Sequence, residues 1–359
     1  MRWWRRNKAD NTVQHRERAD KRFIKKQLRG ITSLVNSKGQ PNINEIWQIA
    51  KDIEAIKLNL KNFGYELALE ASKGLEACEI NGPRVVGLSS KASTQQDLES
   101  DWAAYWLDQL RTKVIYHRKL WEFAYVLQAL WENDKIKAGR RGIGFGCGTE
   151  PIPSYLTSKG VEVTITDLPP NSEEYKKWHD TEQHTTNIKK SHHSGLVDSD
   201  TFERLAALRY VDMNDIPQDI TGYDFCWSIC ALEHVGSIKK GLDFIENSLN
   251  TLVPGGVAVH TTEYNFANDD RTIDNWVTVL FQRKHFQEIH DRLTLKGHRV
   301  AALDFSVGSN PLDRFIDLPP YSHENNEFLA KQWPAAPHLK LTIDGFASTC
   351  FGMLITKAG

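Results

Sequence analysis

The segment richest in chemical possibilities is a glycine loop at residues 142–148, with the sequence GIGFGCG. Gly144, Gly146 and Gly148 form a G-x-G-x-G pattern. Such a loop between a strand and a helix lets the backbone approach a ligand closely at the helix N-terminus. Pro151 suits the first turn of the helix that would follow. The spacing differs from the dinucleotide fingerprint G-x-G-x-x-G, which disfavours a nicotinamide-dependent oxidoreductase.

Acidic residues follow the next two predicted strands. Asp167 closes the alternating, β-branched run 161–166, nineteen residues after Gly148. A carboxylate at the end of the second strand can accept both ribose hydroxyls of an adenosine group. Asp212 follows a third strand, where it can accept from the adenine amino group while Met213 packs on the ring.

Two further signals follow in chain order. The predicted strand 224–229 leads to Glu233 and His234. A predicted helix over 237–252 then runs into Pro254-Gly255-Gly256 and the predicted strand 257–261. Later strands are expected over 299–305 and 348–356, and another helix over 273–295. Strands alternating with helices favour a mostly parallel sheet.

In this order and spacing, residues 140–265 resemble class I S-adenosylmethionine-dependent methyltransferases, and the last strands match more loosely. The resemblance implies an α/β fold with a doubly wound, mostly parallel, seven-stranded sheet that has one antiparallel strand. The stretches around residues 140–169 and 227–265 also look like a bacterial subgroup found among glycan- and polysaccharide-modifying functions. The resemblance implies S-adenosylmethionine as the cofactor, above the carboxyl ends of the strands.

The resemblance places nine residues against this cofactor: Gly144, Phe145, Gly146, Gly148, Asp167, Leu168, Asp212, Met213 and Ser228. The family usually has an acidic residue two positions before the first loop glycine, where this chain has Gly142. The amino-acid end of the cofactor then needs another group, and Arg118, His117 and Trp121 are the candidates.

Methyl transfer is an in-line displacement, and a hydroxyl acceptor benefits from a general base. His234 is the first candidate for this base and Glu263 the second, and Glu233, next to His234, is a further catalytic candidate. An alternative is that His260, Glu263 and Glu233 hold a divalent cation that binds a vicinal diol, because histidine and carboxylate together fit several metals.

The predicted function is O-methylation of a sugar, a glycan or a small metabolite. N- or C-methylation of another metabolite is an alternative. Nucleic-acid and protein N-methylases often carry an N/D-P-P-Y/F tetrad after the fourth strand, whereas residues 228–231 read SICA here. A non-catalytic S-adenosylmethionine-binding partner of a glycan-synthesis complex is the remaining alternative.

The rest of the chain is expected to position this site. Residues 1–96 form a basic arm and a helical region, and residues 97–359 the methyltransferase domain. Within the domain, tryptophan-rich helices over 97–139 are possible lid elements around Tyr105, Tyr116 and Trp121. The long segments 169–208 and 308–338 are predicted to be acceptor-side insertions. The His192-His193 pair is expected in a solvated loop.

A narrow apolar seam runs along the N-terminal helical region with steps of three and four residues. Its members are Ile46, Ile49, Ile53, Ile56, Leu60, Phe63 and Leu67. A seam of this kind needs one partner helix. An internal helix pair is favoured over a homodimer through residues 46–67.

The 359 residues are 40% hydrophobic and 25% charged, which excludes a disordered chain. Residues 1–30 carry eleven Lys or Arg and three Asp or Glu, so they are basic while the remainder is acidic. This asymmetry disfavours nucleic acid as a partner and allows peripheral contact with an anionic membrane. No apolar run is long enough for a membrane span or a signal peptide, and five scattered cysteines favour reduced thiols in the cytoplasm.

Overall fold

The computed structural model describes residues 38, 40–75, 82–169, 187–319, 321 and 337–359. The chain forms two compact units, residues 1–62 and residues 63–359. The basic arm of residues 1–30 lies outside the described residues, and so does its predicted membrane contact. The second unit begins before the boundary expected at residue 97.

The predicted seam lies on two helices, α2 (Ile43–Ala50) and α3 (Ile53–Ser72). Its apolar side chains are exposed in this chain: Ile46 at 42%, Ile56 at 63% and Leu60 at 45%. These exposed side chains have no partner helix among the described residues of their own unit, and both the internal helix pair and the homodimer stay predictions. No described helix combines the length and the apolar character that crossing a membrane requires.

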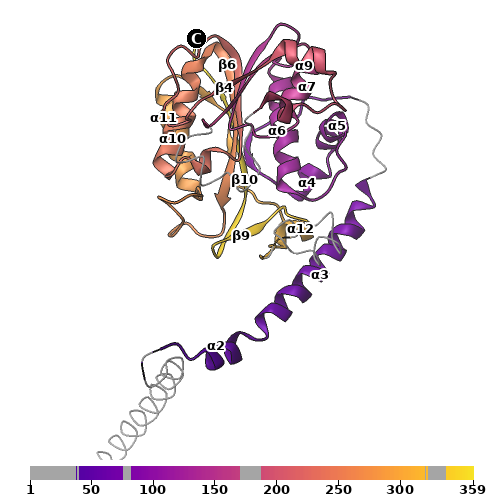
Figure 1. The fold of residues 1–359 in the computed structure, drawn as a ribbon, viewed down its shortest axis with the longest axis vertical. Coiled ribbons are helices and arrows are strands. Elements are labelled where there is room, and N and C mark those ends of the chain that lie inside the picture. Colours follow the sequence, from indigo (N-terminus) through magenta and orange to yellow (C-terminus); the bar gives the residue numbers. More distant parts are fainter. Residues whose placement is uncertain (1–37, 39, 76–81, 170–186, 320, 322–336) are drawn as a thin grey trace, which may run out of the picture. The chain divides into compact units, whose positions relative to one another are not determined.

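The described part of the second unit holds a sheet of ten strands between layers of helices (Figure 1). Eight strands follow one another in the order β4-β3-β2-β5-β6-β10-β1-β8, and β7 and β9 also pair with β10. The strands are β1 (Ser90–Ala92), β2 (Arg141–Phe145), β3 (Glu162–Asp167), β4 (Ala206–Tyr210), β5 (Tyr223–Ile229), β6 (Leu252–Asn265), β7 (Arg299–Val300), β8 (Leu303–Asp304), β9 (Leu341–Ile343) and β10 (Phe346–Thr356). The neighbouring strands β4, β3, β2, β5 and β6 pair in parallel, and β10 is antiparallel to β6. The predicted doubly wound α/β fold is confirmed. Beyond β10, short strands stand in place of the single seventh strand that was expected. Two of them, β1 and β7, pair with different parts of β10.

Helices cover both faces of the sheet. They are α4 (Gln95–Leu98), α5 (Asp101–Gln109), α6 (Arg118–Glu132), α7 (Ile152–Ser158), α9 (Ser199–Leu205), α10 (Ile238–Ser248), α11 (Arg283–Leu295) and α12 (Pro311–Arg314), with short 3₁₀ turns η3 (Ile188–Ser191), η4 (Leu232–His234) and η5 (Leu249–Thr251). Figure 1 shows α5, α6, α7 and α9 on one face and α10 and α11 on the other.

Two predicted elements differ from the structure. The helix expected over 273–295 begins only at Arg283, because Gln282 and His285 cap each other's backbone there. The segment 169–208, which was predicted to be a long insertion, contains regular secondary structure. Its described part contains η3, α9 and the start of β4, and Asp198 caps α9 by accepting from the Thr201 backbone N–H at 2.8 Å.

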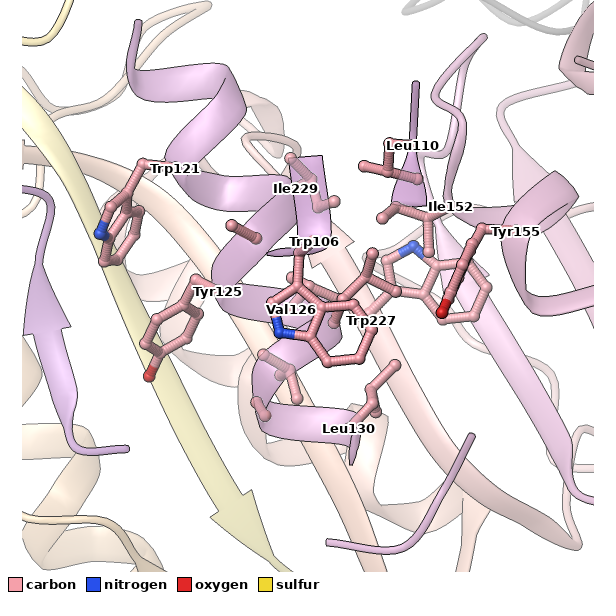
Figure 2. Packing of buried hydrophobic residues seen from close by; sticks show 14 of the residues in the cluster. Trp106, Leu110, Trp121, Tyr125, Val126, Leu130, Ile152, Tyr155, Trp227 and Ile229 are labelled. Atoms are coloured by element: carbon pink, nitrogen blue, oxygen red, sulfur yellow. The ribbon is translucent and has the colours of Figure 1, made fainter. Parts of the chain in front are cut away.

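The tryptophan-rich helices form core rather than a lid. Trp106 and Trp121 are 1% and 0% exposed, and Tyr116 is equally buried. Figure 2 shows Trp106 among Val126, Leu130 and Tyr155, with Trp121 beside Tyr125. Each indole N–H has a buried acceptor, Gln128 for Trp106 and Asp97 for Trp121. These hydrogen bonds tie α6 to α5 and α4, and the burial of Tyr116 and Trp121 corrects their predicted lid role.

The two faces of β6 have different surroundings. Odd-numbered residues such as Val259 belong to the core cluster under α6, and even-numbered residues such as Ala258 to the cluster under α10. His260 faces the α10 side, where Phe244 packs against its ring. Its Nδ1 bonds to the Ser228 hydroxyl at 2.8 Å and its Nε2 to the Ser248 hydroxyl at 3.0 Å. His260 is therefore a structural core histidine.

We expect His260→Gln to remove part of the protein's acid sensitivity. Burial lowers the pKa of His260 to about 3 from 6.5, so the folded state binds fewer protons than the unfolded state between these pH values. The contribution of His260 to the free energy of unfolding is fully present above pH 6.5 and falls as the pH drops toward 3. The largest loss that this group can cause is roughly 5 kcal/mol. Urea unfolding of both proteins at several pH values measures the difference.

The control is His234→Gln, which changes a histidine that is only half-buried. Buried carboxyls with a raised pKa change stability with pH in the opposite direction from His260. They are present in every variant, so their effect cancels in the comparison. Equal loss of stability on acidification in the wild type and in His260→Gln would show that His260 is not buried as a neutral ring.

Candidate functional site

The glycine loop lies where β2 ends and α7 begins. Gly146 and Gly148 have φ values of 62° and 53°, which glycine adopts without steric cost. A Cβ on Gly144 would lie 2.4 Å from the Trp227 ring, and a Cβ on Gly146 would lie 2.8 Å from Ala231. The loop backbone therefore passes directly beside the segment that follows β5. Only a chain without side chains at these positions can form this cradle.

The predicted nucleoside contacts flank the loop. Asp167 ends β3 next to β2, is 4% exposed, and accepts the backbone N–H of the half-buried Leu168 at 2.8 Å. Asp212 is half-buried just after β4 and accepts from the Asn214 backbone N–H at 2.8 Å. The Met213 sulfur would lie 3.7 Å from a Cβ on Gly146. The structure thus brings the loop, Met213 and the strand ends together, and this cradle fits an adenosyl group.

Two predicted cofactor residues point elsewhere. Phe145 is fully buried and packs its ring against Phe244 at 5.3 Å on the α10 side. The Ser228 hydroxyl is bound to His260 on the same side. Because neighbouring side chains of a strand face opposite sides, these two side chains belong to the core. Their predicted cofactor contacts are corrected to backbone proximity only.

Gly142 has no room for the acidic side chain usual in the family, because a Cβ there would lie 2.3 Å from the Phe225 ring. Of the proposed substitutes, Trp121 is enclosed in the core. His117 caps α6, its Nδ1 accepting the Lys119 backbone N–H at 3.0 Å. Arg118 does reach the carboxyl edge of the sheet, where its Nη2 lies 2.6 Å from Glu263 Oε1.

The first turn of α6 thereby brings charges into a buried polar chamber between α6, β6 and the end of β5. Lys119 Nζ lies 2.9 Å from Glu122 Oε2, and the Glu122 side chain is 0% exposed. Burial opposes ionisation of Glu122, but Lys119 and two nearby thiols outweigh it and keep the pKa of this carboxyl below its usual range. Arg118 Nε and Nη1 and Thr261 Oγ1 are buried without hydrogen-bond partners. These atoms are polar groups whose hydrogen-bonding capacity is unused among the described residues.

The three predicted catalytic residues differ in their surroundings. Glu263 is fully engaged, with Arg118 on one oxygen and the Ser348 hydroxyl at 2.7 Å on the other. His234 Nδ1 bonds to the Val277 carbonyl at 3.0 Å. Glu233 is 1% exposed and accepts from the Thr262 hydroxyl at 3.0 Å. Burial, reinforced by Glu263, raises the pKa of Glu233 to about 8.

The predicted diol-binding metal trio does not assemble. His260 and Glu263 are three residues apart on one strand and therefore face opposite sides of the sheet, while both nitrogens of His260 are already bonded. The His192-His193 pair also has structural partners, because the Nε2 atoms bond to the carbonyls of Val197 and Thr149, both at 2.9 Å. The segment is thus tied to the glycine loop rather than solvated.

Residue-type reasoning alone missed part of the site. Glu150, two residues after the last loop glycine, accepts the Trp227 indole N–H at 2.6 Å, and burial raises its pKa to about 8. Lys119 and Glu122 were also missed. Their spacing of three on a predicted helix was the available signal, since such a pair meets on one face. Within the insertions, residues 170–186 and 322–336 lie outside the described part of the chain.

Comparisons with known proteins identify the family of the chain. The sequence matches the methyltransferase domain family over residues 115–305. Among solved structures, the [4+2]-cyclase SpnF is 13% identical, with 82% of this chain and 97% of that chain covered and a TM-score of 0.44. The methyltransferase domain of bacterial CtHen1-C is 16% identical (70% and 100% covered, TM-score 0.40), and phosphoethanolamine N-methyltransferase 2 of Haemonchus contortus is 14% identical (65% and 52% covered, TM-score 0.37). No curated protein sequence matches.

Because the family match spans more than half of the sequence, the chain belongs to the methyltransferase domain family, and its predicted nature as an S-adenosylmethionine-dependent methyltransferase is confirmed.

Proposed function

We propose that this methyltransferase transfers the methyl group to a hydroxyl of a sugar, a glycan or a small metabolite. The observation that carries the proposal is the position of Glu233, a buried carboxyl two residues beyond Ala231, which touches the glycine loop. A hydroxyl gains from a base at this point, whereas a neutral amine does not need one. The glycan class is supported only by the resemblance of residues 140–169 and 227–265 to glycan-associated enzymes.

Bound S-adenosylmethionine supplies a methyl group on a positively charged sulfonium. The protein's task is to orient the two reactants and to remove a proton. Asp167 and the glycine loop hold the adenosyl end, and Glu233 takes the proton from the acceptor hydroxyl. The ion pair of Arg118 with Glu263 holds the first turn of α6 against β6, and Lys119 balances the buried carboxylate of Glu122 within α6.

We expect Asp167→Ala to abolish cofactor binding while leaving the fold intact. The wild type should bind S-adenosylmethionine and S-adenosylhomocysteine with micromolar affinity in calorimetry. Loss of the carboxylate removes the ribose acceptors and should weaken binding at least about 30-fold, or roughly 2 kcal/mol for hydrogen bonds to a charged group.

The matched control is Glu162→Ala, which removes an exposed carboxylate from the other end of the same strand. Equal affinity of wild type and Asp167→Ala would contradict the placement of the nucleoside. Absence of binding by the wild type would favour a non-catalytic role or a site completed by another protein.

We expect Glu233→Gln to lower kcat by about 10²- to 10⁴-fold with little change in cofactor affinity, because general-base catalysis contributes factors of this size. The assay is transfer of labelled methyl to a panel of monosaccharides, nucleotide sugars and hydroxylated metabolites, with amines included. Glu246→Gln on α10, whose carboxylate pairs with surface residues, is the control.

Unchanged turnover in Glu233→Gln would remove Glu233 from the mechanism. Methylation of an amine, with no hydroxyl accepted from the panel, would favour the N-methyltransferase alternative.

A further inference from the structure

Two cysteines and a glutamate meet in the chamber in a way that the methyl-transfer scheme does not use. Cys230 directly follows β5, Cys350 lies on β10, and Glu122 reaches them from α6. The two sulfurs are 3.5 Å apart, and Glu122 Oε1 lies 2.6 Å from the Cys230 sulfur and in contact with the Cys350 sulfur. The three residues come from distant parts of the chain, so the fold itself assembles this cluster.

The spacing of the sulfurs suits a common metal ligand set. Two thiolates bound to one tetrahedral zinc ion at about 2.3 Å lie about 3.8 Å apart. The observed separation differs from this by only a few tenths of an ångström. The Glu122 carboxylate is now closer to the sulfurs than a shared metal allows, and a displacement of roughly 1 Å, within the reach of a side-chain rotation, makes room for the ion.

The donor types select the metal. Thiolate sulfur is a soft ligand that favours zinc over magnesium or calcium, and a carboxylate oxygen is an accepted zinc ligand. We propose that Cys230, Cys350 and Glu122 form a zinc site with three protein ligands and one open position.

The charges balance. Binding of one Zn²⁺ releases the two thiol protons to solvent, so the net charge of the chamber does not change. The carboxylate ligand keeps its existing countercharge, because Lys119 Nζ is held on its other oxygen at 2.9 Å. The second cation, Arg118, is held by Glu263 at 2.6 Å. Lys119 and Arg118 therefore each balance one carboxylate, and the two thiolates balance the charge of the zinc ion.

Polar groups lie near the position of a fourth ligand. The donor atoms of Cys230, Glu233 and Glu263 all lie within 4.8 Å of one another, so the Cys230 sulfur is close to the proposed base. Thr261 Oγ1 is fully buried on the Glu263 face of β6 and has no hydrogen-bond partner among the described residues. A solvent molecule or acceptor hydroxyl bound as the fourth ligand would find hydrogen-bond partners in these groups. Three protein ligands with one open position are typical of catalytic zinc, which lowers the pKa of a bound hydroxyl.

The role in activating an acceptor rests on the proposed function, but the metal site does not. We would purify the full chain without a histidine tag from zinc-supplemented cells and measure metal per polypeptide by mass spectrometry. About one zinc per chain is expected in the wild type. Cys230→Ser and Cys350→Ser should each lower it about tenfold. Cys226→Ser, a buried cysteine of β5 whose sulfur is absent from the cluster, is the matched control and should retain the metal.

A second readout does not require the variants to fold equally well. Cobalt added to the metal-free wild type should give the charge-transfer absorption of cobalt bound to thiolate. A wild type that binds neither zinc nor cobalt after reconstitution overturns the proposal, as does an equal loss of zinc in Cys226→Ser. Calorimetry with S-adenosylhomocysteine on the same preparations separates these outcomes from a failure of the proposed function. A protein that binds S-adenosylhomocysteine but binds neither zinc nor cobalt refutes only the zinc site.

Discussion

The site depends on the ion pair of Arg118 with Glu263, which ties the first turn of α6 to the carboxyl edge of the sheet. Within α6, Lys119 pairs with the buried carboxylate of Glu122, while the Lys119 side chain itself is 38% exposed. A buried charge alone would be costly, and pairing makes the arrangement tolerable without making it a large source of stability. The value of these contacts is geometric. Arg118 holds the helix that precedes β2 against β6, and Glu122 contacts the sulfurs of Cys230 and Cys350 at the end of β5 and on β10.

The apolar packing of α6 supports this geometry. Below its first turn, α6 presents Trp121, Tyr125 and Leu130 to the core, and the tryptophan N–H groups find buried acceptors. This packing keeps the first turn of α6 beside the end of β6. The glycine loop approaches its neighbours closely because Gly144 and Gly146 lack side chains. Trp227 fills the space above Gly144 and bonds to Glu150 at 2.6 Å, so loop, strand and helix form one packed unit.

Much of the fold could be predicted from sequence because its signals are local. The strand ending at Asp167, the strand over 223–229 and the glycine loop each carry a short pattern that needs no tertiary information. The errors have equally physical causes. Phe145 and Ser228 lie in the right segments, but strand parity directs their side chains into the core. The helix expected from residue 273 starts ten residues later because its first stable cap forms at Gln282.

The chamber could not be predicted because its members are far apart in the chain. Glu122 and Cys350 are 228 residues apart, and only the pairing of Glu263 with Cys350 across β6 and β10 brings the second thiol under α6. The same pairing separates the roles of the acidic residues. Glu263 is used to hold Arg118 and Ser348, whereas Glu233, beyond the end of β5, accepts a hydrogen bond from the Thr262 hydroxyl. A carboxyl bound to a cation is a poor proton acceptor, since the cation stabilises the form that has already lost its proton. Of the three catalytic candidates from sequence, the one left with the environment of a base is therefore Glu233, although the sequence favoured His234 and then Glu263 for that role.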